Sequence, residues 1–252
     1  MRVVFAGPSL YGAPTNAFEG LCRRPPAQCG DVLAAVEEGA TAIGLIDGFF
    51  EVRRSPWHKE ILWALSHGIP VLGAASLGAL RAAEMAPFGM KPVGVIARLF
   101  SRAVLTDDDE VAVLHGPEET GFLPLTESVA NIRFNLRRAR RLGVISRLIE
   151  DRAVQVARSI FYKERTYETV LERLQQECSV PTVEGLRRWL DTSRCDLKQE
   201  DAMALLACLR SGAKPPVPPP GFVGTRFWRD FLAELAPPAR GVRAEGGGSW
   251  GP

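Results

Sequence analysis

The stretch PVLGAASLGALRAAE, residues 70–84, is expected to decide the fold of this chain. It begins with a short apolar run, continues through a turn of small residues with a single serine, and ends in an alanine-rich segment. These patterns predict a strand, a tight turn and a helix, in that order. Ser76 is therefore expected at the point where the strand passes into the helix.

Two functions of Ser76 are compatible with this position. As an N-cap, its hydroxyl would accept a hydrogen bond from a first-turn amide, which stabilises a helix by about 1 kcal/mol. As a nucleophile, it would stand on a variant of the G-x-S-x-G elbow in which Ala74 replaces the first glycine and Gly78 keeps the last. The helix start would then offer backbone amides to a developing oxyanion. The local sequence leaves both interpretations open.

The segments before this stretch alternate between strand-like and helix-like patterns. Strands are predicted at 2–6 and 42–46, and helices at 30–39 and 56–68. This alternation predicts an α/β fold in which a doubly wound parallel sheet has helices on both faces. We assign it to an N-terminal domain of residues 1–125.

Polar side chains follow three of the predicted strands. Ser9, Asp47 and Ser76 each come just after a strand. In an open parallel sheet, ligands bind beyond the carboxyl ends of the strands. If the three strands are neighbours, one carboxylate and two hydroxyls meet in a single crevice. The sequence therefore predicts a functional site at this edge of the sheet.

Two basic side chains belong to the helix predicted after Asp47. His58 with a serine and a carboxylate would complete the set used in acyl transfer, where the base takes the hydroxyl proton and the acid fixes the imidazole tautomer. Lys59 is a second candidate base, because a desolvated lysine beside a serine serves the same purpose. The alternative is that both residues belong to a solvated helix face together with Glu60.

Charged residues further along have a structural and a functional interpretation. The three-residue spacing of Arg81 and Glu84 predicts a local ion pair. Four consecutive acids at 107–110 repel one another unless they are solvated or meet a divalent cation, although the run lacks the spacing of a calcium loop. The apolar segment 111–114 predicts a further strand, which would bring these acids to the edge of the sheet.

Residues 126–212 are predicted to form a mainly helical region. Apolar spacing indicates helices at 126–143, 146–161, 166–177, 182–191 and 197–210. The second half of the chain carries 21 Lys and Arg against 15 Asp and Glu, whereas the first half carries 10 against 14. Because acids are interspersed among these bases, we expect a solvated face and no nucleic-acid binding; contact with a protein or an acidic peptide is the alternative.

Residues 213–252 are the third predicted part. The proline-rich segment 214–221 is expected to be a stiff, extended linker. Aromatic residues at 222–232 are expected to fold back on the body of the protein, because exposed aromatic side chains promote aggregation. The glycine-rich end, residues 246–252, is expected to be disordered.

Composition excludes several classes of protein. No apolar run approaches the roughly 20 residues needed to cross a bilayer, and the N-terminal apolar run is too short for a signal peptide, so we expect a cytoplasmic protein without membrane contact. The five cysteines form no C-x-x-C pair, and no G-x-x-x-x-G-K-[ST] loop is present. We therefore expect reduced thiols, no metal and no cofactor.

Taken together, these motifs resemble the TfuA-like proteins. The order and density of the matching segments make the resemblance specific, although any one of them alone is weak. The segments are Gly7-Pro8-Ser9, Gly30-Asp31, Ile46–Phe50, Trp57–Ile61, Gly73–Glu84 and Asp107–Val113. The chain has Ala75 and Leu77 where that family often has serine or methionine, but it keeps Ser76.

The resemblance implies a function in peptide modification. TfuA-like proteins are associated with YcaO-type cyclodehydratases in backbone thioamide formation, in which YcaO activates the amide oxygen with ATP and sulfur replaces it. The implied partners are a YcaO enzyme, a ubiquitin-like sulfur carrier and, through YcaO, a precursor peptide. The chain would either release sulfide from the thiocarboxylated carrier or recruit and activate YcaO without chemistry. A small-molecule-binding α/β protein is the third hypothesis.

The residues favour the hydrolase among these hypotheses. A thiocarboxylate is an acyl group with a good leaving group, so its cleavage requires a nucleophile and oxyanion donors. Ser76 would attack, His58 or Lys59 would move the proton, Asp47 or one of the acids at 107–110 would orient the base, and water would complete the reaction. The residues expected to contact substrate are Ser9, Leu77, Gly78, Arg81 and Asp109.

Overall fold

The computed structural model describes residues 1–215 and 220–235. By their contacts the residues divide into two compact units, Met1–Phe222 and Val223–Pro252. The predicted boundaries after residues 125 and 212 stay predictions.

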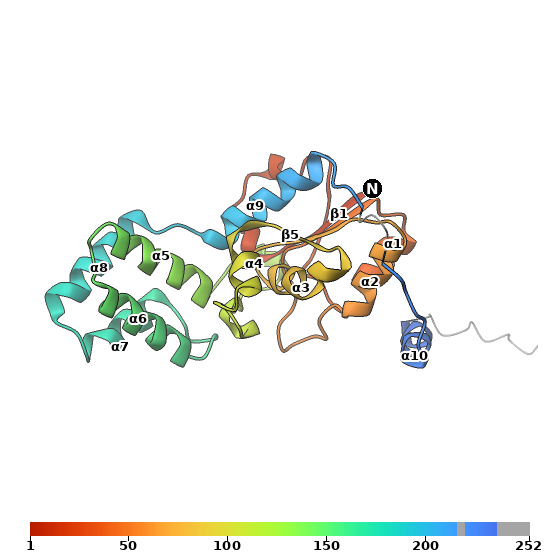
Figure 1. Cartoon of the computed structure of the whole chain (residues 1–252). Coiled ribbons are helices and arrows are strands. Elements are labelled where there is room, and N and C mark those ends of the chain that lie inside the picture. Colours follow the sequence, from red (N-terminus) through yellow and green to blue (C-terminus); the bar gives the residue numbers. More distant parts are fainter. Residues whose placement is uncertain (216–219, 236–252) are drawn as a thin grey trace, which may run out of the picture. The chain divides into compact units, whose positions relative to one another are not determined.

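A five-stranded sheet forms the centre of the first unit (Figure 1). The strand order is β2-β1-β3-β4-β5, and every pairing is parallel. The strands are β1 (Arg2–Phe5), β2 (Cys22–Arg24), β3 (Ala42–Leu45), β4 (Val71–Gly73) and β5 (Lys91–Pro92). The predicted α/β fold with a parallel sheet is thus confirmed. The edge strands β2 and β5 were not predicted, because they have two or three residues and are charged or contain proline.

Three helices cover one face of the sheet. They are α1 (Asp31–Glu37), α2 (His58–Ser66) and α3 (Leu77–Met85). Alternate residues of a strand point to opposite faces, so Val3 and Phe5 of β1 pack with the apolar residues of these helices, among them Ile61. The apolar cluster on this face is larger than the one on the opposite face of the sheet.

The opposite face is covered from the far end of the chain. Helix α9 (Leu197–Arg210) packs Leu205 and Leu209 against Val4 of β1 and Leu72 of β4. Figure 1 shows α9 on one side of the strands and α2 and α3 on the other. The sheet is therefore doubly wound, but its second layer comes from the mainly helical part of the sequence.

The remaining helices of the first unit extend this core. Helix α4 (Gly94–Ser101), which was not predicted, packs beside α3 and α9. Four helices then form a separate apolar cluster: α5 (Val129–Arg141), α6 (Arg147–Ser159), α7 (Tyr167–Gln175) and α8 (Val180–Ser193). The prediction of a mainly helical C-terminal region is confirmed, and three of these four helices begin at a serine or threonine side chain that accepts a first-turn amide hydrogen bond.

The strand predicted at 111–114 is wrong. The segment follows a short 3₁₀ turn, η4 (Asp108–Glu110), and runs as irregular chain to a single bridge between His115 and Pro124. Its apolar side chains are held by packing, with Val111 buried against α3 and α4. A short apolar run did not distinguish a strand from a buried loop.

The end of the described chain contains aromatic residues. Phe222 packs edge-on against Trp63 of α2, with 5.0 Å between ring centroids, as the fold-back prediction requires for this residue. In the second unit, α10 (Arg226–Leu235) has Trp228 and Phe231 buried and Phe227 exposed. Residues 216–219 of the predicted proline-rich linker and the tail at 246–252 lie outside the described residues. No helix among the described residues is long and apolar enough to cross a membrane.

Candidate functional site

The tips of three neighbouring strands form the predicted edge. Asp47, after β3, accepts hydrogen bonds from the Gly7 and Ser9 amides at 2.8 and 3.1 Å and from the Ser9 hydroxyl at 2.6 Å. Ser9 belongs to η1 (Pro8–Leu10), the 3₁₀ turn that follows β1, and Gly7 is the residue just before this turn. Because β1, β3 and β4 are adjacent, Ser76 follows the next strand along. Ser9 and Asp47 are therefore in contact, and Ser76 lies at the same edge of the sheet.

Ser76 stands on a strained turn. The residue before it, Ala75, is fully buried and has a φ of 65°, a left-handed conformation that is uncommon for a residue with a Cβ. Ser76 occupies the N-cap position of α3, but its side chain makes no capping hydrogen bond. Its hydroxyl instead donates to the carbonyl oxygen of Val111 at 3.3 Å. The N-cap interpretation is therefore wrong.

Lys198 reaches the same carbonyl from the opposite layer. Its Nζ donates to the Val111 oxygen at 2.7 Å, and the residue is 3% exposed. Burial lowers the pKa of Lys198, while the carboxylates of Asp47, Asp196 and Glu127 oppose that shift. A buried lysine and a serine hydroxyl thus meet on one acceptor atom.

A cavity of about 310 Å³ opens beside Ser76 and Asp47. Its lining is mostly apolar and aromatic: Phe49, Phe50, Leu77, Leu80, His115 and Tyr162 contribute to it. The Nδ1 atom of His115 lies 2.7 Å from the Gly116 oxygen, and its ring packs edge-on against Phe122. An apolar cavity with a few convergent polar groups is the usual form of a ligand site.

A second, more polar cavity of about 610 Å³ adjoins the first. The two share Pro8 and Val113, and the polar cavity is lined by Ser9 and Lys198. Lys198 therefore lies at the boundary between a polar cavity and the serine.

Two carboxylates line the polar cavity close to Lys198. The side-chain amide of Asn131 donates to Glu127 at 2.9 Å and to Asp196 at 3.0 Å, which holds the two acids together. Burial, with the charge of Asp196, raises the pKa of Glu127. Tyr167 packs below Arg194, and burial raises its pKa well above the ordinary value.

The predicted bases on α2 have other partners. His58 Nε2 lies 2.8 Å from Glu84 Oε2, and Arg81 binds the same oxygen at 2.7 Å, so the predicted Arg81–Glu84 ion pair is confirmed. The Lys59 ammonium lies 5.4 Å from the ring centroid of Phe222. Neither His58 nor Lys59 lines the cavity that contains Ser76. The structure joins Ser9 to Asp47 and places Asp47 and Ser76 in the lining of one cavity, and it leaves these two bases and Arg81 outside that cavity.

The two residues after the serine have distinct environments. Leu77 lines the apolar cavity. Gly78 is packed so closely that a Cβ there would lie 1.8 Å from the Leu45 carbonyl oxygen, and its amide donates to the Ile46 carbonyl at 3.1 Å. Gly78 thus fixes the start of α3 against β3, which aims the turn at the strand tips.

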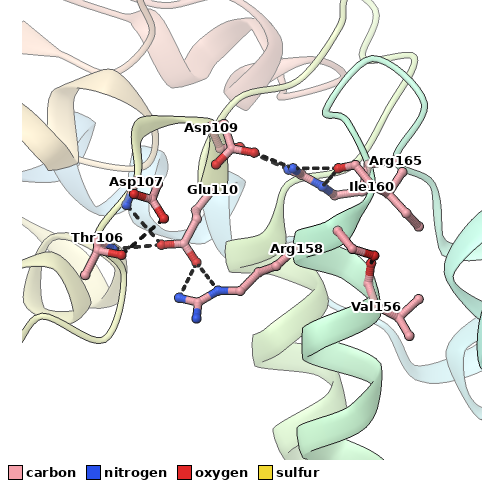
Figure 2. A network of polar contacts seen from close by, with 9 residues as sticks. Thr106, Asp107, Asp109, Glu110, Val156, Arg158, Ile160 and Arg165 are labelled. Atoms are coloured by element: carbon pink, nitrogen blue, oxygen red, sulfur yellow. Dashed lines mark hydrogen bonds and ion pairs between the residues drawn. The ribbon is translucent and has the colours of Figure 1, made fainter.

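The acidic run is compensated by arginines (Figure 2). Asp109 binds Arg165 at 2.6 Å, and Glu110 binds Arg158 at 2.6 Å. The second Glu110 oxygen accepts the Thr106 amide at 2.7 Å. Within the described residues, no group of three or more His, Cys, Asp or Glu side chains is arranged to hold a metal ion. The five cysteines, all described, form no disulfide.

Lys198 and His115 are the site residues that the sequence did not reveal. Lys198 is separated from Ser76 by more than 120 residues, and it lies in a predicted helix with ordinary charge spacing. His115 directly follows the segment 111–114, which was predicted to be a strand and gave no sign of a cavity. The neighbours of Lys198 in the sequence, Leu197 and Gln199, gave no signal that the lysine is buried.

The fold and the site define a doubly wound α/β protein with an apolar cavity at the carboxyl edge of its sheet. Residues 47–166 match the family model described as TfuA-like protein, which confirms the predicted resemblance over this region. The match contains Asp47 and Ser76 but begins after Ser9 and ends before Lys198. The search of curated proteins found no match to this chain. TfuA-like proteins are associated with YcaO-dependent thioamidation, so the match supports a role of that kind.

Proposed function

We propose that the chain supplies sulfur to a YcaO enzyme by hydrolysing a thiocarboxylated ubiquitin-like carrier protein, with Ser76 as nucleophile. The observation that carries this proposal is the apolar cavity in which Ser76 and Asp47 meet at adjacent strand tips. The strained Ala75 supports it, because backbone strain concentrates at functional turns.

The reaction needs a nucleophile, an oxyanion donor and a leaving group. Ser76 Oγ attacks the terminal carbonyl carbon of the carrier, and the amide of Leu77, the residue after the nucleophile, has the position that donates to the oxyanion in elbow turns. The carbon–sulfur bond breaks, and the serine proton leaves with sulfur as hydrosulfide. Water then cleaves the ester, which restores the serine and yields the carrier carboxylate and a proton.

Asp47 contributes through its position. Its two oxygens hold the η1 turn through Ser9 and Gly7, so the carboxylate has a fixed orientation beside the serine. Ser9 and Leu77 are proposed to contact substrate, and Gly78 supports them through its close packing. Proton transfer by His58 or Lys59, and substrate contact by Arg81 or Asp109, stay predictions.

The test is sulfide release from a purified thiocarboxylated carrier, with and without YcaO. Ser76→Ala is expected to lower the rate by at least about 10²-fold, because the covalent step is lost. Ala83, which is also in α3, provides a control: Ala83→Ser adds a hydroxyl at a half-buried position about two helical turns after Ser76 and reports on disturbance of the helix. Unchanged carrier cleavage and thioamide yield in Ser76→Ala would rule out the hydrolase hypothesis.

A non-catalytic adaptor that recruits or activates YcaO is the second candidate. It is favoured by one observation: Ser76 is only 8% exposed and already donates its hydroxyl to a backbone carbonyl. If the protein is an adaptor, YcaO still requires it when sulfide is supplied directly. If it is a hydrolase, added sulfide makes it dispensable.

A further inference from the structure

We propose that Lys198, from α9, accepts the proton of Ser76 when that hydroxyl attacks the acyl carbon. The inference rests on the proposed function, because it names the base for the same serine. It assigns a catalytic residue outside the segment that matches the TfuA-like family.

The geometry comes first. The Ser76 Oγ and the Lys198 Nζ both donate to the Val111 carbonyl oxygen, at 3.3 and 2.7 Å. Two donors on one acceptor are neighbours, and the serine bond is long for a hydroxyl donor. Proton transfer between them requires the serine side chain to turn from the Val111 carbonyl toward the amine. No other amine or imidazole among the described residues shares an acceptor with Ser76.

The surroundings of Lys198 favour a neutral amine that can become charged. Burial lowers its pKa, which increases the fraction of neutral amine with a free lone pair. Three carboxylates face it from different elements: Asp47 after β3, Glu127 before α5 and Asp196 before α9. They stabilise the ammonium that forms when the proton arrives.

The proton balance closes with these groups. The serine proton moves to Lys198 Nζ as the oxygen–carbon bond forms, and the ammonium gives it to the departing sulfur as the carbon–sulfur bond breaks. In the second half, the neutral amine takes a proton from water as hydroxide attacks the ester, and it returns a proton to the serine oxygen. No oxidant, reductant or cofactor takes part.

The polar cavity offers a way to test this directly. It is lined by Lys198, so removal of the lysine side chain opens the Nζ position to small molecules. A small primary amine in solution should then replace the missing base. A lysine that only supports the fold would not be replaced in this manner.

The experiment measures sulfide release by the full-length protein as a function of pH. Lys198→Met is expected to lower the rate by about 10²- to 10⁴-fold, the usual contribution of a general base. It is also expected to remove the rise in rate with pH that the lysine produces. Methylamine is expected to restore activity to Lys198→Ala, at a rate that increases with amine concentration. Glu200→Gln, on the exposed side of α9, is the matched control for the helix.

His58→Gln and His115→Gln test the competing bases in the same assay. The proposal is overturned if either of them removes the rising pH limb, or if Lys198→Met keeps it. If the lysine variants fail to fold, as judged by circular dichroism, the pH–rate profiles of the wild-type protein and the two histidine variants still test whether a histidine is the base. An inactive Ser76→Ala with fully active, folded Lys198→Met would end this inference and leave the hydrolase; an active Ser76→Ala would end both.

Discussion

Single buried carboxylates hold much of the backbone of this protein in place. Asp47 binds the amides of Gly7 and Ser9 at the start of η1, and Asp201 binds the Val95 and Ile96 amides at the start of α4. Glu60 accepts the Gly30 amide at 2.8 Å and the Trp57 amide at 2.9 Å, so it caps α1 and α2 together. Each of these carboxylates accepts hydrogen bonds from backbone N–H groups that would otherwise need water as acceptor.

Glu60 gives a prediction at this scale. Burial raises its pKa above 4.5, because the backbone donors do not fully offset the loss of solvation. Its stabilising contribution is therefore complete below that ordinary value and falls as pH rises through the raised one. Glu60→Gln, which leaves one amide without its acceptor, is expected to cost about 1–3 kcal/mol.

The loss of unfolding free energy in Glu60→Gln should be larger near pH 5 than near pH 8. Urea denaturation of the wild-type protein and the variant at both pH values measures this. Glu37→Gln, at an exposed position of α1, is the control and is expected to change stability by less than about 0.5 kcal/mol. A cost that grows with pH would contradict the assignment of Glu60.

At the scale of elements, two glycines bring α3 against the sheet. A Cβ on Gly73 of β4 would lie 2.0 Å from the Gly78 carbonyl oxygen, and a Cβ on Gly78 would lie 1.8 Å from that of Leu45. The strand, the turn and the helix therefore pass one another with backbone contact only. This approach leaves Ala75 in its strained conformation and directs Ser76 to the cavity.

Gly78→Ala is expected to destabilise the protein by at least about 3 kcal/mol, because the added methyl group meets rigid backbone. It should also lower activity by moving the serine. Gly185→Ala in α8 is the matched control: nothing lies within 4 Å of its Cβ position, and the better helix propensity of alanine should add up to about 1 kcal/mol. Similar melting temperatures for the two variants would contradict the packing argument.

At the scale of the first unit, the η4 segment connects the helical cluster to the sheet layers. Arg165, 0% exposed, donates to the Ile160 carbonyl, the Asp109 carbonyl and the Asp109 carboxylate (Figure 2). Val111, the acceptor of Ser76 and Lys198, follows directly. The arginine thus supports the segment that carries the site.

Arg165→Met is expected to cost about 3 kcal/mol, because methionine fills the volume but leaves buried carbonyls without donors. Amide hydrogen exchange at residues 106–112 should become faster. The control is Arg147→Met, which breaks an ion pair whose side chains are 85% and 63% exposed and should cost less than about 0.5 kcal/mol. Unchanged amide hydrogen exchange around Val111 would show that Arg165 does not support the segment that carries the site.

The sequence by itself determined the parallel sheet, the positions of β1, β3 and β4 along the chain, most helices, and the placement of Ser9, Asp47 and Ser76 just after strands; that these strands are neighbours came from the structure. These features follow from apolar periodicity, turn residues and the rule that strand ends share an edge, all of which are local. It did not reveal β2, β5 or α4, because their signals are short or charged.

Only the tertiary structure decided what surrounds the serine. Helix α9 brings Lys198 to Val111 from the far end of the chain, whereas His58 pairs with Glu84 on another face. Such contacts depend on the packing of elements distant in sequence, which apolar spacing cannot specify. The same packing turns Ser76 from a plausible helix cap into a donor to Val111, since the close approach of α3 to β3 leaves its hydroxyl facing that carbonyl.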